Sequence, residues 1–294
     1  MSEITRVGVV GCGIMGSGIA EAVARAGRDV VVSEVDEAVL AAGRARIERS
    51  LERALERGKI DLAAKELALA RLRFVTGLEA LADRELVIEA VAEDLALKSE
   101  VFGELDRLLP AGAVLASNTS SIPIADLASA TGRPGSVVGM HFFNPVPVLE
   151  LVEVVPSVLT DEATVVAAER FASAVLGKTV VRARDRAGFV VNALLVPYLC
   201  SAIRMVENGL ATARDVDRGM ELGCAHPMGP LRLADLIGLD TLLAIAESLH
   251  AEHAEPHLAP PPLLRRMVSA GLLGRKSGRG FHDYGGGDGA EGGR

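Results

Sequence analysis

The residues of this sequence best suited to acid/base chemistry lie between His141 and Glu153. His141 follows a short apolar run, and a turn containing Pro145 and Pro147 leads into a second apolar run that carries Glu150 and Glu153. If both runs are strands, the turn brings a carboxylate back to the imidazole. An imidazole beside a carboxylate is suited to moving a proton on and off an alcohol oxygen.

The residues alone leave two alternatives open. Glu150 and Glu153 lie on opposite faces of a strand, so alternation does not choose between them. A lone histidine at a strand end is more often structural than catalytic. Further hydroxyl groups come from Ser117–Ser121, at the end of another predicted strand, but Ser120 could also be the N-cap of a helix predicted from 122 to 128.

A glycine-rich turn near the N-terminus predicts a nucleotide site. A strand predicted at 6–10 is followed by Gly11-Cys12-Gly13-Ile14-Met15-Gly16 and by a helical pattern. In such a turn Gly11 permits the tight bend, Gly13 lets the backbone approach a pyrophosphate, and Gly16 lets the helix pack closely on the strand. A glycine turn with no ligand is the alternative.

The end of the next predicted strand supports the nucleotide site. This strand, at 29–33, leads to Glu34, which follows the glycine turn by about 20 residues. A carboxylate there can accept a hydrogen bond from the ribose 2′-hydroxyl and would repel a 2′-phosphate. The sequence therefore favours NAD over NADP.

The remaining periodicities predict an α/β fold, a doubly wound Rossmann-like sheet followed by an all-α domain. A charged stretch at 182–188 lacks periodicity and marks the domain boundary. Asn192 lies in the first helix beyond it, on an apolar surface where its amide needs partners in the protein or in a ligand. We therefore expect a cofactor domain at 1–184, a helical domain at 185–284 and a disordered tail at 285–294. Further strands are expected at 86–89, 113–116, 137–140 and 178–181, and helices at 37–72 (a pair), 95–109 and 162–176.

Arginines recur at every fourth position of the first helix in that pair, beside glutamates. The mixed signs favour a solvated face with Arg–Glu pairs over a basic surface for a ligand's phosphates. The residues are Arg49, Arg53 and Arg57, beside Glu48, Glu52 and Glu56.

Composition and charge exclude several classes of function. The net charge of −8 over 294 residues disfavours nucleic acid and anionic membranes as partners. The 3 cysteines are far apart, and Pro256 breaks the helix between His253 and His257, so we expect no metal site. The first residues enter a strand at once and resemble neither a signal nor a transit peptide, so a cytoplasmic protein is expected.

Six motifs in order resemble the short-chain L-3-hydroxyacyl-CoA dehydrogenases, of the bacterial 3-hydroxybutyryl-CoA dehydrogenase type. The similarity runs from about residue 4 to 284, and six motifs together are far more specific than any one. The motifs are Gly11–Gly16, Ser117–Ser121, His141–Pro147, Gly188–Asn192, His226–Pro230 and Gly278–Phe281.

The resemblance implies a role for each matching residue. The family's catalytic pair falls on His141 and Glu153, its hydroxyl-binding serine on Ser120, and its active-site asparagine on Asn192. Glu34 stands where the family usually has Asp, one methylene shorter, and keeps the chemistry. The cofactor contacts implied are Gly11, Gly13, Ile14, Met15, Gly16, Glu34, Glu93, Lys98, Asn144 and Lys276.

The resemblance also implies a function, NAD-dependent and reversible oxidation of a short (S)-3-hydroxyacyl-CoA by a homodimer. Two alternatives are a dehydrogenase of a free hydroxy acid or sugar acid, and a non-catalytic NAD-binding protein on the same scaffold. Comparing acetoacetyl-CoA with free acetoacetate as substrates would distinguish the first alternative from a thioester dehydrogenase. The joint presence of Ser120, His141, Glu153 and Asn192 argues against the second.

Overall fold

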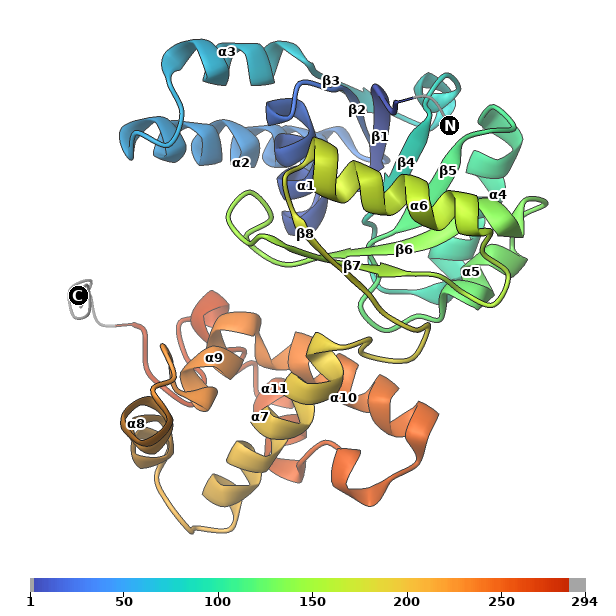
Figure 1. Ribbon diagram of the computed structural model, residues 1–294. Coiled ribbons are helices and arrows are strands. Elements are labelled where there is room, and N and C mark those ends of the chain that lie inside the picture. Colours follow the sequence, from blue (N-terminus) through green and yellow to red (C-terminus); the bar gives the residue numbers. More distant parts are fainter. Residues whose placement is uncertain (1–2, 286–294) are drawn as a thin grey trace. The chain divides into compact units, whose positions relative to one another are not determined.

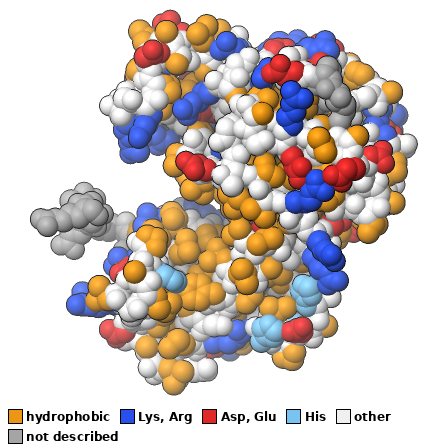
Figure 2. All heavy atoms as spheres, in the orientation of Figure 1, with side chains coloured by type: hydrophobic (Ala, Val, Ile, Leu, Met, Phe, Trp, Pro, Cys, Tyr) orange, Lys and Arg blue, Asp and Glu red, His pale blue; other side chains and the backbone are white. Residues whose placement is uncertain are grey.

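The computed structural model describes residues 3–285, and the chain divides into two compact units, Met1–Asp185 and Arg186–Arg294. The first unit is built on a sheet and the second consists of helices (Figure 1). Acidic and basic side chains are interspersed over the first unit on the face drawn in Figure 2. Among residues 3–285, no helix has the length and apolar character to cross a membrane. Residues 286–294 of the predicted tail lie outside the described part.

The first unit contains one sheet of eight strands within the described residues, ordered β3-β2-β1-β4-β5-β6-β7-β8. From β1 the chain builds outward in both directions, which confirms the predicted doubly wound sheet. Every neighbouring pair is parallel except the antiparallel pair β6 and β7. The strands are β1 (Arg6–Val10), β2 (Asp29–Glu34), β3 (Leu72–Thr76), β4 (Leu86–Glu89), β5 (Val114–Ser117), β6 (Val137–Phe142), β7 (Leu151–Val155) and β8 (Thr179–Arg182).

Helices cover this sheet, and one strand replaces part of a predicted helix. The helical pair expected to reach residue 72 ends at Ala70, and β3 follows as an edge strand. The helices of the first unit are α1 (Ile14–Arg25), α2 (Glu37–Glu56), α3 (Leu62–Ala70), α4 (Leu95–Leu108), α5 (Ile124–Ser129) and α6 (Glu162–Arg170).

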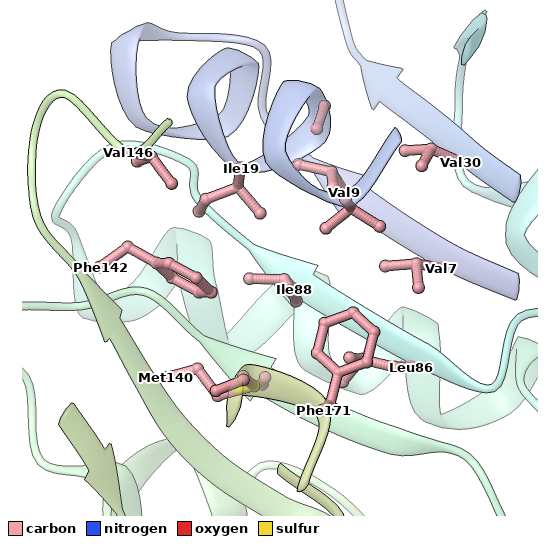
Figure 3. Close-up of a cluster of buried hydrophobic side chains, with 14 of the residues drawn as sticks. Val7, Val9, Ile19, Val30, Leu86, Ile88, Met140, Phe142, Val146 and Phe171 are labelled. Carbon is pink, nitrogen blue, oxygen red and sulfur yellow. The ribbon is translucent and has the colours of Figure 1, made fainter. Parts of the chain in front are cut away.

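One hydrophobic core cluster of the first unit lies between one face of the sheet and the helices α1, α2 and α6. Figure 3 shows Ile19 of α1 and Phe171, which follows α6, lying over the strand residues Val9, Ile88 and Phe142. All five side chains are buried. The branched side chains of the strands thus hold the helix that follows the glycine turn against the sheet.

Of the two roles considered for Ser120, that of a helix N-cap is contradicted by the start of α5. Helix α5 begins at Ile124, with Pro123 at its N-cap position. The Asp185 carboxylate accepts hydrogen bonds from the first backbone N–H groups, those of Ile124 and Ala125 (2.8 and 2.9 Å). A carboxylate from a distant part of the chain therefore takes the capping role.

The second unit is helical over its described residues, as predicted. Its core gathers buried side chains from α7, α9, α10 and α11, with Leu199, Leu231 and Leu242 fully buried. The helices are α7 (Val191–Glu207), α8 (Ala213–Cys224), α9 (Pro230–Ile237), α10 (Leu239–His253) and α11 (Pro262–Ser269).

Candidate active site

The turn between β1 and α1 has the geometry of a pyrophosphate cradle. Gly11 has φ +93°, a conformation that L side chains rarely adopt. A Cβ on Gly16 would lie 1.8 Å from the carbonyl oxygen of Gly11, so only glycine allows this close packing. A Cβ on Gly13 would meet nothing within 4 Å. Gly13 therefore serves no packing need of its own, and open space lies before the N-terminus of α1.

Glu34 lies at the carboxyl end of β2 and is joined to this turn. Its Oε2 accepts a hydrogen bond from the Cys12 backbone N–H (2.8 Å), and its Oε1 accepts one from Val35 (2.9 Å). Both oxygens retain lone pairs for a ribose hydroxyl. A pocket of about 570 Å³ adjoins it, and its lining includes Gly11, Gly13, Glu34, Val35, Val39 and Val91. The residues present therefore fit the adenosine and pyrophosphate of NAD.

The histidine and one of the two candidate glutamates are brought together by strand pairing. His141 on β6 pairs in register with Glu153 on β7, and His141 Nδ1 lies 2.6 Å from Glu153 Oε2. Glu153 is fully buried and His141 is nearly so, whereas Glu150 is exposed. The antiparallel register decides what alternation alone left open, because directly opposite residues point to the same face of a sheet.

The pair lies on the face of the sheet that α5 covers. Met140 and Phe142 point into the core on the other face, so His141 between them points away from it. Gly139, two residues earlier, faces Ile124 of α5. The ring of Phe143 lies 4.5 Å from the imidazole, centroid to centroid. The imidazole is thus confined by an aromatic ring and by its carboxylate partner.

The hydroxyl-bearing segment after β5 is tied to the strand end that carries His141. Asn118 Oδ1 accepts a hydrogen bond from the Phe142 backbone N–H (2.9 Å). Glu93 Oε1 accepts hydrogen bonds from the backbone N–H of Ser120 (2.9 Å) and from the hydroxyl of Thr119 (2.6 Å). Ser120 is therefore fixed next to the histidine strand through its backbone N–H, and its hydroxyl also donates a hydrogen bond to Glu93 Oε1 (3.3 Å).

Two predicted cofactor contacts, Glu93 and Lys98, bind each other in this structure. Lys98 is buried, and its Nζ lies 2.6 Å from Glu89 Oε1 and 3.3 Å from Glu93 Oε2. Burial alone would raise the pKa of Glu93, but Lys98 and the hydrogen bonds from Thr119 and Ser120 hold this pKa below its ordinary value. Glu93 is therefore a carboxylate at neutral pH.

Asn144 lies at the rim of a second pocket, which carries positive charge. This pocket, of about 230 Å³, is lined by Asn144 to Pro147, by Ser17 and Glu21 of α1, and by Arg46, Ser50 and Arg53 of α2. Burial raises the pKa of Glu21, against the opposing effects of Ser50 and Arg25. Two glutamates of the predicted Arg–Glu pairs along α2 have other partners in the structure, since Glu48 pairs with Arg44 and Glu52 with Lys65.

Two predicted site residues belong to the second unit. Asn192 is the second residue of α7, and its side chain is partly buried. Lys276 lies in the turn Arg275–Ser277, where its Nζ forms an ion pair with the carboxylate of Asp240 (2.5 Å).

Three residues that organise this site could not be singled out from the sequence. Asn118 holds the serine segment to β6, Glu89 holds Lys98, and Arg46 donates a hydrogen bond to the carbonyl of Cys12 in the glycine turn (3.0 Å). Asn118 was visible within the Ser117–Ser121 motif, and Glu89 as a charge at the end of an apolar strand. Their partners depend on which strands become neighbours.

Comparison with known proteins gives matches along nearly the whole chain. Residues 6–186 match the family described as "3-hydroxyacyl-CoA dehydrogenase, NAD binding domain", and residues 188–284 match "3-hydroxyacyl-CoA dehydrogenase, C-terminal domain". The chain is 62% identical over 282 residues to a 3-hydroxybutyryl-CoA dehydrogenase of Mycobacterium tuberculosis, covering 96% of this chain and 99% of the relative.

Solved structures agree with these matches. The crystal structure of M. tuberculosis FadB2 is similar with a TM-score of 0.95 and 62% identity, over 96% of this chain and 100% of that one. The crystal structure of (S)-3-hydroxybutyryl-CoA dehydrogenase PaaH1 from Ralstonia eutropha gives a TM-score of 0.91 and 44% identity, over 96% of this chain and 99% of that one.

Proposed function

The chain belongs to the 3-hydroxyacyl-CoA dehydrogenase family, and from this premise we propose that it oxidises short (S)-3-hydroxyacyl-CoA thioesters reversibly to 3-ketoacyl-CoA with NAD. 3-Hydroxybutyryl-CoA is the proposed substrate, because relatives that match nearly the whole chain are named for it. The observation that carries the proposal is the buried contact between His141 and Glu153, since removing hydride from an alcohol carbon requires a base at its oxygen.

His141 takes the proton from the C3 hydroxyl of the substrate. With the other ring proton on Nδ1 and accepted by Glu153, Nε2 is the basic nitrogen, and the Glu153 carboxylate then stabilises the imidazolium that forms. Ser120 and Asn192 hydrogen-bond the substrate's oxygens and orient C3. NAD, when bound, supplies the hydride acceptor.

The residues that would hold NAD come from several segments. The turn residues Gly11, Gly13, Ile14, Met15 and Gly16 would receive the pyrophosphate, and Glu34 the adenosine ribose. Glu93, Lys98, Asn144 and Lys276 are proposed as further contacts on the family pattern. The open space at Gly13 supports the placement of the pyrophosphate, and the position of Glu34 supports that of the ribose.

The basic pocket beside Asn144 supports a CoA thioester over a free hydroxy acid. Arg46 and Arg53 bring two cations to this pocket, whose lining also includes Glu21 and the turn at 144–147 that follows His141. CoA carries phosphates on its adenosine end, and guanidinium groups bind phosphate well. A free hydroxy acid would have no use for such a pocket.

Substrate comparison tests the proposal. We would follow NADH oxidation with acetoacetyl-CoA, with free acetoacetate, and with NADPH in place of NADH. Rapid turnover only with the thioester and NADH is the expected result. Turnover of free acetoacetate alone would favour a free-acid dehydrogenase. Normal NADH binding without turnover of either substrate would favour a non-catalytic protein.

A cytoplasmic homodimer is also part of the proposal. Large hydrophobic side chains gather on the surface of the second unit (Figure 2), and a symmetric partner would remove them from water. The exposed leucines of the second unit include Leu194, Leu210, Leu222 and Leu236. A sedimentation measurement should give the mass of two chains, and a single-chain mass at micromolar concentration would contradict the dimer.

A further inference from the structure

Glu89 lies at the carboxyl end of β4, opposite Ser117 of β5, and none of its surface is exposed. Its Oε2 accepts a hydrogen bond from the Ser117 hydroxyl (2.7 Å). Its Oε1 accepts hydrogen bonds from the Val91 backbone N–H (2.7 Å) and from Lys98 Nζ (2.6 Å). A buried carboxylate is costly, and here each oxygen has a donor.

Two routes of contacts connect Glu89 with the serine segment. In the first, the Ser117 hydroxyl that Glu89 holds accepts a hydrogen bond from the Thr119 backbone N–H (3.2 Å). In the second, Lys98 lies between Glu89 and Glu93, and Glu93 accepts hydrogen bonds from the backbone N–H groups of Ser120 and Ser121 (2.9 and 3.2 Å). Both routes end on the backbone around Ser120.

We propose that Glu89 is a positioning residue, which fixes the backbone around Ser120 through Ser117 and through the Lys98–Glu93 pair. It touches neither substrate nor cofactor in this account. The inference rests on the proposed function for its effect on turnover, because Ser120 is there a substrate-binding residue. Its structural part, the ordering of residues 119–121, stands independently of the reaction.

The chain offers a matched control at the opposite end of the sheet. Arg84 is a buried cation held by two carboxylates, Asp29 and Asp83, at the amino ends of the strands. Glu89→Gln leaves Lys98 with one carboxylate, and Asp29→Asn leaves Arg84 with one carboxylate. Each variant therefore removes one of two carboxylate partners from a buried cation, although Asp29 itself is exposed and Glu89 is not, and only the first variant is connected to Ser120.

Backbone hydrogen exchange of the full chain is the first readout. E89Q should speed exchange at the amides of Thr119, Ser120 and Ser121, and D29N should leave these amides unchanged. If E89Q does not fold, S117A breaks the first route without leaving a charge unpaired, and the same amides are measured. Unchanged exchange in the variant that folds would overturn the inference, whatever the enzyme's substrate.

The second readout is a double-mutant cycle on kcat for acetoacetyl-CoA reduction at saturating NADH, so that weaker cofactor binding through Lys98 or Glu93 does not enter the comparison. E89Q should lower kcat by about 10–100-fold in the wild-type chain, as displacement of a binding group does, but by less than about twofold in S120A. D29N should cost about the same small factor in both backgrounds. An equal cost of E89Q in both backgrounds would mean a purely structural role and would overturn the inference. If the wild-type chain does not turn over the thioester, the proposed function fails and the exchange data alone decide.

Discussion

His141 Nδ1 and Glu153 Oε2 lie 2.6 Å apart at directly paired positions of two antiparallel strands. This pairing is the one antiparallel pair of neighbours in the described sheet. Strands fix side-chain geometry more firmly than loops do, so the imidazole is oriented before substrate arrives. The predictions below follow from this geometry and from the segments around it.

Replacing Glu153 with Gln should lower kcat by about 100-fold or more, because a neutral amide cannot stabilise the imidazolium. Gln keeps an oxygen that can accept from Nδ1, so the fold and NADH binding should change little. Steady-state kinetics measures kcat, and a fluorescence titration measures NADH binding. Near wild-type kcat in E153Q would remove Glu153 from the mechanism.

Two alanine substitutions in the glycine turn should separate cofactor binding from folding. A methyl on Gly13 meets no protein atom within 4 Å, so G13A should fold normally and weaken NADH binding by about 10–100-fold through steric overlap. A methyl on Gly16 would lie 1.8 Å from the Gly11 oxygen, so G16A should lose about 3 kcal/mol or more of unfolding free energy.

Thermal unfolding and NADH titration of the two glycine variants supply the test. The fit of NAD to this turn would be contradicted by wild-type NADH affinity in G13A. The packing argument would fail if G16A melted at the wild-type temperature.

Arg53→Ala should raise the KM for acetoacetyl-CoA by about 3–10-fold, because an exposed guanidinium–phosphate contact is modest in energy. The KM for NADH should stay unchanged, and the effect should shrink at high salt. Arg44→Ala is the control, since Arg44 lies on the same helix and pairs with Glu48 instead of lining the pocket. Equal effects of the two variants would leave the pocket without a role in CoA binding.

Glu93 should make stability depend on pH. Its pKa in the folded protein lies below the ordinary value, so its carboxylate stabilises the fold above about pH 4.3 and loses this effect as the pH falls through the folded pKa. The melting temperature of the wild type should therefore exceed that of E93Q near pH 7, and the difference should shrink toward about pH 3. A melting-temperature difference between the wild type and E93Q that stays constant over this pH range would contradict a lowered pKa of Glu93.

The first half of the sheet could be predicted because its signals are local. Apolar runs of strand length, the glycine turn and Glu34 follow one another in sequence, and the structure gives β1, α1 and β2 at those places. Strand β3 was hidden because it follows α3 after the single residue Arg71, without the glycine or proline that usually marks a change of element. Its half-buried edge position also leaves little alternation to detect.

Site residues that belong to a sequence motif could be predicted. Site residues whose partners depend on strand register could not. Residue spacing left Glu150 and Glu153 equivalent, and only the pairing of β6 with β7 places Glu153 opposite His141. The alternative role of Ser120 as an N-cap does not hold, because Pro123 and the distant Asp185 carboxylate define the start of α5. The contacts of Glu89 likewise require β4 and β5 to be neighbours, which no local pattern reveals.

The central claim is that His141 moves the proton in an NAD-dependent reaction on an acyl-CoA thioester. The measurement that tests it most directly is kcat for NADH oxidation with acetoacetyl-CoA by the wild type and by H141Q, with the NADH dissociation constant measured on both. The account predicts a kcat lower by about 10²–10⁴-fold in H141Q with unchanged NADH affinity. A kcat near that of the wild type in H141Q would contradict it.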